Sequence, residues 1–299
     1  MLQNILQKLY IIESIPSYPT MKDKLQMISQ DIDFRSDNNL DKFCNFLLYD
    51  PSMTIKFLKI ANADSFGFQN KISSLHNALL LLDDDLVKLI ISQHPVMSNL
   101  KIYHEGMENE FLKLLKHSIE VQVIVQNILN VIYKEEDAEN IKKEIHAAAS
   151  LHDIGLIFLL IYFPDYYIKL INKIRESETA QQKQEYVPIP SHSFLGSLLC
   201  KFWNLPAFIR TSISFHHFPW ASDKDSAYGS EILYLADSIS TSFYDLFHLD
   251  DIYTVDEHII MRRNVLEIIE KLEIDISIIA EIRIRSQNQL QDLYLDFGI

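Results

Sequence analysis

Glycine and proline are both scarce in this chain of 299 residues, with 6 and 9 copies. Segments that alternate Val or Thr with polar residues, as half-buried strands do, are also few. Long runs of Leu, Ile, Lys and Glu, which are favourable helix residues, make up much of the rest. We therefore expect an all-α fold, and the length suggests two modest domains.

Positive charge is the second shortage. Lys and Arg number 27 against 41 Asp and Glu, which leaves a formal net charge of −14. Proteins that bind nucleic acids or anionic membranes do so through clustered basic side chains. No run of basic residues is present, so we expect neither a nucleic-acid partner nor a membrane partner.

Cysteines and long apolar segments are rare as well. Cys44 and Cys200 are the only cysteines, which fits reduced thiols in a cytoplasmic protein better than a disulfide framework. The longest apolar run, 154–163, has about half the length needed to cross a bilayer. The N-terminal segment 1–16 has apolar residues at helical spacing and no cleavage site, so we expect a helix there and not a signal peptide.

Helix caps and apolar periodicity divide the chain into two parts, with the boundary in a loosely composed stretch near Gly106. We predict an N-terminal helical region over 1–105 and a second helical domain over 106–299. Asp50-Pro51 is a strong helix start, because Asp caps the helix and Pro fits its first position. The main expected helices cover about 20–31, 38–48, 51–62, 109–133, 137–154, 164–175, 231–239, 255–272 and 276–297, with polar loops at 176–186 and 222–226.

One dipeptide, His152-Asp153, places an imidazole beside a carboxylate in a segment otherwise built for burial. Neighbouring residues on a regular helix point about 100° apart, so the two side chains could share one metal ion or phosphate only where the helix is distorted. Gly155 would permit such a distortion. Alone, however, the dipeptide is weak evidence for a site.

Further candidate ligands fall in apolar helical contexts along the chain, and the full set is His117, His152, Asp153, His192, His216, His217 and Asp237. Imidazoles and carboxylates bind iron, manganese, magnesium or zinc, and two neighbouring ions would need about this number of ligands. The alternative is that single histidines of the set are core residues bonded to backbone carbonyls. We interpret the other histidines, at 76, 94, 104, 146, 248 and 258, as structural or solvent-facing.

The first part of the chain resembles the HDOD family, named for an HD-related output domain. The resemblance rests on motifs that occur in the family's order: Ile15-Pro16, Pro19, Leu48-Tyr-Asp-Pro-Ser-Met-Thr54, Leu58-Lys-Ile-Ala-Asn-Ala63, Phe66-Gly67 and Ile72-Ser-Ser-Leu-His-Asn-Ala78. It implies a helical, non-catalytic N-terminal region. The triple Asp at 83–85 departs from the family, which usually has a glycine-bearing turn there.

In the second part, the order His, His-Asp, His, His-His, Asp resembles the metal-dependent phosphohydrolases of the HD superfamily, and most of all the HD-GYP phosphodiesterases. The resemblance assigns His117, His152, Asp153 and Asp237 to the basic metal set. It assigns His192, His216 and His217 to the additional ligands of multi-metal members. Leu156 stands where active relatives have a phosphate-binding Lys, Phe218 stands where a Glu follows the paired histidines, and no Gly-Tyr-Pro follows.

These departures favour a regulatory protein of the HDOD type, mostly non-catalytic, which keeps an HD-type metal site and acts through signalling protein partners. A metal-dependent phosphohydrolase acting on a cyclic dinucleotide or another nucleotide phosphate is the alternative. A helical scaffold without metal is the third possibility. In either of the first two cases a divalent ion (Fe, Mn, Mg or Zn) is the expected cofactor, and a nucleotide or cyclic dinucleotide is a candidate ligand.

Overall fold

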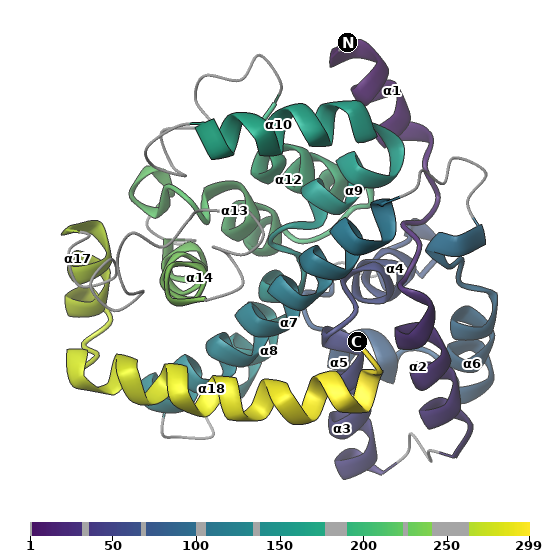
Figure 1. Ribbon diagram of the computed structural model, residues 1–299. Helices are drawn as coiled ribbons and strands as arrows, with labels where there is room; N and C mark the ends of the chain where they lie inside the picture. Colours follow the sequence, from purple (N-terminus) through teal and green to yellow (C-terminus); the bar gives the residue numbers. More distant parts are fainter. Residues whose placement is uncertain are drawn as a thin grey trace.

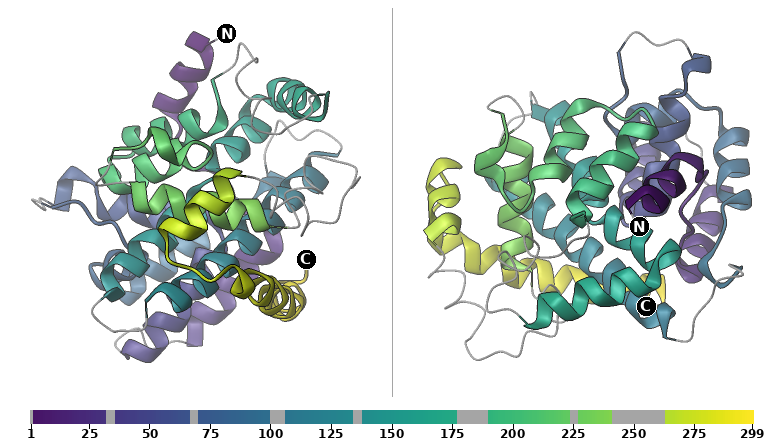
Figure 2. Two further views of the ribbon diagram at one scale, coloured as in Figure 1. Left: turned by 90° about the vertical axis from the view of Figure 1, so that its left-hand side faces the viewer. Right: turned by 90° about the horizontal axis from the view of Figure 1, so that it is seen from above.

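The computed structural model describes residues 2–31, 36–66, 70–99, 106–133, 138–176, 190–223, 227–240 and 263–299. Within these ranges every regular element is a helix, and the only strand-like pairing is an isolated bridge between Ser17 and Val96. The predicted all-α class is confirmed. Figures 1 and 2 show the helices in three orientations.

Three of the N-terminal helices begin within one residue of the starts predicted at 20, 38 and 51. The helices of this region are α1 (Leu2–Ile11), α2 (Pro19–Asp31), α3 (Asp37–Leu48), α4 (Pro51–Ala61), η1 (Asp64–Phe66), α5 (Leu75–Leu80), α6 (Asp84–Gln93) and η2 (Met97–Asn99). Asp50 caps α4 by accepting hydrogen bonds from the backbone N–H groups of Ser52 and Met53. Asp83, the first residue of the triple Asp, caps α6 in the same way.

The second part of the chain contains the longer helices. They are α7 (Met107–Ile132), α8 (Glu139–Leu151), α9 (Ile154–Tyr162), α10 (Pro164–Glu176), α12 (His192–Phe202), α13 (Ala207–Phe215), η4 (Pro219–Ala221), α14 (Ala227–Ile239), α17 (Arg263–Lys271) and α18 (Ile276–Phe297). The expected single helix over 137–154 therefore ends early, and a second one begins after it. The predicted loop at 176–186 and the first half of the predicted helix at 255–272 lie almost entirely outside the described residues.

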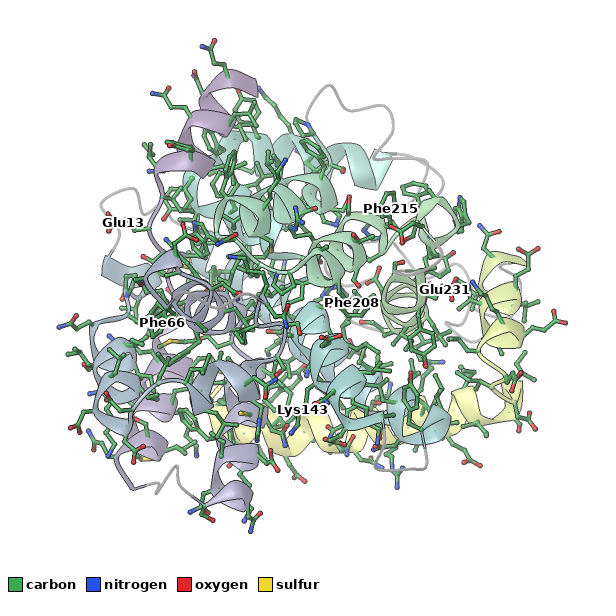
Figure 3. All side chains as sticks on the ribbon, turned by 180° about the vertical axis from the view of Figure 1, so that it is seen from behind. Glu13, Phe66, Lys143, Phe208, Phe215 and Glu231 are labelled. Atoms are coloured by element: carbon green, nitrogen blue, oxygen red, sulfur yellow. The ribbon has the colours of Figure 1, made fainter. Side chains whose placement is uncertain are left out.

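Helix α7 runs diagonally through the centre of Figure 1 and packs against α8, α9, α14 and α18. Helix α13, on which Phe208 and Phe215 are labelled in Figure 3, packs between α12 and α14. The two-helix segment from Glu139 to Tyr162 is the one described stretch long and apolar enough to cross a bilayer, and 89% of its apolar window is buried inside the protein. That burial is typical of core helices.

The largest hydrophobic core joins the two parts of the chain. It contains Ile5, Leu9 and Ile55 from the first part together with Leu151 and Leu156 from the second. Residues 100–105, where the domain boundary was placed, lie outside the described residues. The division at 105/106 remains a prediction, but the two parts share one core.

Candidate metal centre

The His152-Asp153 dipeptide lies at the break between α8 and α9. His152 still has helical backbone angles, whereas Asp153 has φ −105° and ψ 16°, so the helix is interrupted at this point. This interruption lets the two side chains face the same space, which a regular helix would not permit. Their facing atoms, His152 Nε2 and Asp153 Oδ2, are 3.5 Å apart.

Gly155 has a different role from the one the sequence suggested. Its backbone is not in the left-handed region. A Cβ atom at this position would lie 2.0 Å from the carbonyl oxygen of His192 and 2.9 Å from the backbone nitrogen of Gly196. Glycine is therefore needed because α12 crosses α9 almost in backbone contact, and this crossing places His192 beside Asp153.

The other candidate ligands come from four further places in the fold. His117 lies in the middle of α7, His192 is the first residue of α12, His216 and His217 follow α13, and Asp237 lies near the end of α14. None of the seven side chains predicted from the sequence is more than 8% exposed. The structure brings all of them into one buried cluster.

The first half of the cluster, called here the His117 group, consists of His117, His152, Asp153 and Asp237. His117 Nε2 lies 3.1 Å from Asp237 Oδ1, 3.5 Å from Asp153 Oδ2 and 3.3 Å from His152 Nε2. Imidazole and carboxylate atoms thus converge from three helical segments onto one small volume.

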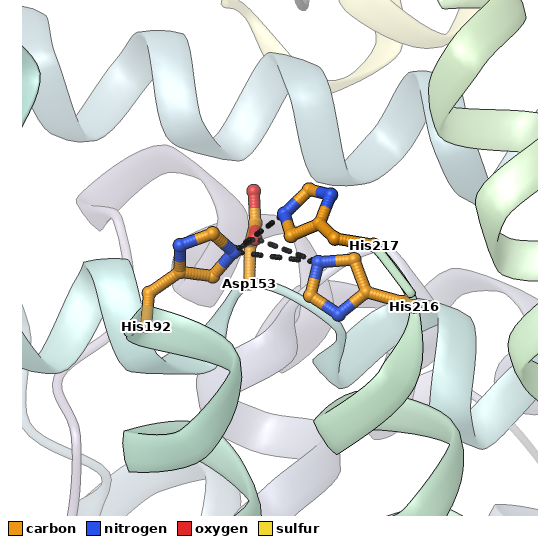
Figure 4. A group of neighbouring side chains, drawn as sticks. All are labelled: Asp153, His192, His216 and His217. Atoms are coloured by element: carbon orange, nitrogen blue, oxygen red, sulfur yellow. Dashed lines mark hydrogen bonds and ion pairs between the residues drawn. The ribbon is translucent and has the colours of Figure 1, made fainter. Parts of the chain in front are cut away.

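The second half, called here the His192 group, consists of Asp153, His192, His216 and His217 (Figure 4). His192 Nε2 lies 3.0 Å from Asp153 Oδ1, 3.3 Å from His216 Nε2 and 3.0 Å from His217 Nε2. In Figure 4 the Asp153 carboxylate lies between the ring of His192 and the rings of His216 and His217.

Asp153 belongs to both groups, and its two oxygens face different ones. Oδ2 faces His117 and His152, whereas Oδ1 faces His192 and His216. Ligands held about 2.0–2.2 Å from one tetrahedral ion lie about 3.4 Å from each other. The contacts of 3.0–3.7 Å in the cluster match that spacing. Each of the two groups could therefore hold a metal ion, and Asp153 belongs to both.

Hydrogen bonds outside the cluster indicate which ring nitrogens carry lone pairs. Nδ1 of His152 donates to the carbonyl oxygen of Ala149 over 2.8 Å, and Nδ1 of His216 donates to that of Ile213 over 2.6 Å. In the deprotonated form that binds metal, Nε2 of each ring is then an acceptor. These acceptors face the nitrogens of other imidazoles, an arrangement that a cation between them would stabilise.

The pKa values of the cluster show the balance between burial and charge. Burial lowers the pKa of His152, but the Asp153 carboxylate outweighs it and raises this pKa to about 9. Burial raises the pKa of Asp153, but the imidazoles of His152 and His192 hold it well below its usual range. Burial and neighbouring imidazoles lower the pKa values of His216 and His217, which favours neutral rings able to bind metal.

Three histidines that the sequence set aside are described, and they lie apart from the cluster. His76 Nε2 lies 3.3 Å from Asp41, and His146 Nδ1 accepts a hydrogen bond from the Gln122 amide. His94 is buried, and burial together with nearby lysines lowers its pKa to about 4. His104, His248 and His258 lie outside the described residues.

Two residues next to the cluster were missed by the sequence argument. Ser240 Oγ lies 3.3 Å from His117 Nδ1 and donates a hydrogen bond to Glu120. Glu120 follows His117 by three residues and so lies on the same face of α7. Its position in an apolar stretch was the available signal, because buried carboxylates need partners.

Leu156 and Phe218 are two residues that depart from the pattern of the active phosphohydrolases. Leu156 is fully buried in the largest hydrophobic core, so no charge reaches the cluster from this position. Phe218 is half-buried and contacts Trp220 edge to face. The segment after it forms the short helix η4.

The family of the chain follows from comparison of its sequence with known families. The sequence matches the HDOD domain over residues 15–219, which is more than two thirds of the chain. This chain belongs to the HDOD family. Comparison with curated proteins gives no match.

Several solved structures share the fold of this HDOD protein. A virulence factor from Campylobacter jejuni is 14% identical, with a TM-score of 0.64, and the alignment covers 97% of this chain and 100% of the other. The MmoQ response regulator from Methylococcus capsulatus is 16% identical, with a TM-score of 0.61 and coverage of 91% and 99%. A protein named "putative phosphohydrolase" from Shewanella amazonensis is 15% identical, with a TM-score of 0.50 and coverage of 98% and 97%. At these identities the likeness shows the fold alone.

Proposed function

We propose that this HDOD protein is a cytoplasmic regulatory protein that holds two divalent metal ions in its His/Asp cluster and signals through a protein partner, with little or no hydrolytic turnover. The observation that carries the proposal is the position of the Asp153 carboxylate, which lies between two groups of imidazoles with one oxygen toward each. Imidazole and carboxylate donors favour iron, manganese or zinc.

Burial of these polar groups favours a bound metal ion. Seven ionisable side chains are almost fully buried, and several imidazole nitrogens face each other at 3.0–3.3 Å. Buried charges are stabilised by partners of opposite charge or by metal coordination, and a buried lone pair needs a hydrogen-bond donor or a cation. His117, His152, Asp153 and Asp237 would hold one ion, and Asp153, His192, His216 and His217 the other.

Leu156 disfavours efficient hydrolysis. Bound metal ions would supply Lewis acidity and a phosphate anchor. Phosphoryl transfer also gains from a side-chain cation at the developing charge. Leu156 directs its side chain into the hydrophobic core, so the position that carries a Lys in active relatives contributes no charge here.

Metal content of the purified protein, measured by elemental analysis, tests the metal site. We expect about two ions per wild-type chain from the ligand arithmetic and a strong loss in Asp153→Asn, because the amide cannot bridge two cations. Asp50→Asn is the matched control, since it neutralises a buried carboxylate that caps α4 far from the cluster in sequence. A wild-type protein without metal, or an Asp153→Asn variant with full metal content, would contradict the proposal.

A metal-dependent phosphohydrolase is the second candidate function, and the completeness of the ligand set favours it. The metal-loaded protein can be assayed on cyclic dinucleotides and on a generic phosphodiester. Turnover in the usual enzyme range, about 1–1000 per second, that disappears in Asp153→Asn would replace the regulatory proposal. Leu156→Lys is a poor rescue variant, because the new ammonium group would be buried in the core.

Helix α8 provides the path by which the cluster would reach a partner. It packs against α3, α4 and α5, and Ser150, two residues before His152, donates a hydrogen bond to Thr54 of α4. Metal binding at the end of α8 would thus bias the packing of the N-terminal region. Hydrogen exchange in α3–α5 is expected to slow when metal is added, and equal exchange with and without metal would contradict this coupling.

A further inference from the structure

A chain of three buried polar groups leads away from the His117 group. His117 Nδ1 lies 3.3 Å from Ser240 Oγ, and Ser240 Oγ lies 2.8 Å from Glu120 Oε2. The three residues are 0%, 0% and 3% exposed. Ser240 follows α14 directly, so this chain ties the end of α14 to the middle of α7.

The numbers of donors and acceptors assign the protons among these three side chains. A serine hydroxyl has one proton, and Ser240 gives it to the Glu120 carboxylate, which only accepts when ionised. Ser240 Oγ then accepts from His117, so Nδ1 of His117 carries a proton. In the neutral ring that can bind a metal ion, the lone pair is on Nε2. That Nε2 atom is the one that faces Asp237, Asp153 and His152.

A histidine ligand backed by a carboxylate is a stronger and better oriented donor than one without such a partner. Here the Ser240 hydroxyl lies between the Glu120 carboxylate and the His117 imidazole. Two histidines of the His117 group therefore have their outer nitrogens bonded, His117 through Ser240 and His152 through the Ala149 carbonyl. Glu120 also places a third carboxyl group on this side, after those of Asp153 and Asp237.

The imidazoles of the His192 group have fewer hydrogen bonds that fix their orientation. His216 donates to a backbone carbonyl, but Nδ1 of His192 has no hydrogen-bond partner in the part of the chain that the structure describes. His217 directs Nδ1 toward Asp237 Oδ2 at 3.5 Å, within the cluster itself. The two groups share Asp153, but in the described residues the imidazole backed by a carboxylate from outside the cluster is that of His117.

We infer that Ser240 and Glu120 are positioning residues for His117 and that they make the His117 group the tighter of two unequal metal sites, so that it fills first. The inference rests on the proposed metal-binding function and adds an order of loading to it. Under limiting metal, the protein would then hold one ion in the His117 group and leave the His192 group to respond to changes in metal supply.

Titration of metal-free protein with Co²⁺ tests this order, with calorimetry for affinity and visible absorption for coordination. Wild type is expected to bind in two steps. Ser240→Ala should weaken the first step about 10- to 100-fold and change its absorption spectrum, while the second step is retained. Glu120→Gln keeps an acceptor for Ser240 but removes the charge, so it should weaken the first step less. His192→Ala should remove the second step alone.

Ser230→Ala is the matched control. Ser230 is also fully buried and belongs to α14, but its hydroxyl donates to the carbonyl oxygen of Ala227 and not toward a metal ligand. It should leave both steps and the spectrum unchanged.

Two results would overturn the inference while leaving the metal site intact. One is two-step binding in which Ser240→Ala and Glu120→Gln leave the first step at its wild-type affinity. The other is an equal loss in Ser240→Ala and Ser230→Ala, which would indicate packing and not orientation. If Ser240→Ala does not fold, Glu120→Gln decides between the same outcomes. A wild-type protein that binds no Co²⁺, Mn²⁺, Fe²⁺ or Zn²⁺ would instead refute the proposed function itself.

Discussion

Gly155 shows how a single residue without a side chain positions the candidate ligands around it. The carbonyl oxygen of His192 occupies the space that a Cβ atom would need. Because the obstructing atoms belong to the backbone, no rotamer change can relieve the contact. The crossing of α9 and α12 therefore depends on glycine at this position.

Gly155→Ala is expected to lower the free energy of unfolding by about 1–3 kcal/mol or more and to reduce the metal content by shifting His192 away from Asp153. Urea denaturation and elemental analysis measure the two effects. Gly106→Ala serves as the control, because a Cβ there meets nothing within 4 Å and only its φ of +92° is unfavourable. A Gly155→Ala variant with the stability of wild type would show that the helices are not in backbone contact.

At the scale of the helix, the Asp50 cap of α4 makes both a favourable and an unfavourable contribution to the stability of the fold. Asp50 satisfies two backbone N–H groups, yet it is only 2% exposed, and burial raises its pKa to about 6. The folded protein therefore binds more protons than the unfolded chain between about pH 4 and pH 6. Stability should decrease as the pH rises through this window.

The size of this decrease can be measured against Asp50→Asn, which keeps the cap without the charge. A shift of about two pH units corresponds to roughly 3 kcal/mol, so wild type should lose up to about that much free energy of unfolding between pH 4 and pH 7 relative to the variant. Asp50→Ala should be less stable than Asp50→Asn at every pH, because the cap itself is lost. Parallel pH profiles for wild type and Asp50→Asn would show that burial does not raise this pKa.

For the whole molecule, the cluster acts as a link between helices distant in the sequence. Its side chains come from α7, the α8–α9 break, α12, the end of α13 and α14, so bound ions would connect five parts of the fold. A ligand that binds only the folded state stabilises it by about 3–4 kcal/mol at 100 to 1000 times its Kd.

Removal of metal by a chelator is therefore expected to lower the Tm of wild type by several degrees, and added metal should restore it. The Asp153→Asn variant is the control, since it lacks the bridging carboxylate and its Tm should not respond. Differential scanning calorimetry measures both proteins. An equal response in the two would place the stabilising metal elsewhere in the molecule.

Local patterns in the sequence determined the helices and the candidate metal ligands. Scarce glycine and proline indicated an all-α fold, Asp50-Pro51 marked the start of α4, and the order of histidines and aspartates identified all seven members of the cluster. Helix propensity, capping and periodicity act over a few residues, so they can be recognised without knowledge of the packing.

Only the tertiary structure decided how these elements meet. It divides the expected helix over 137–154 at His152, because Asp153 leaves the helical conformation there. It assigns Gly155 to a helix crossing, directs Leu156 into the core, and brings Ser240 beside His117 across 123 positions of the chain. Each of these features depends on which helix faces meet, and that choice is made by burial of the whole apolar surface at once, which no local pattern contains.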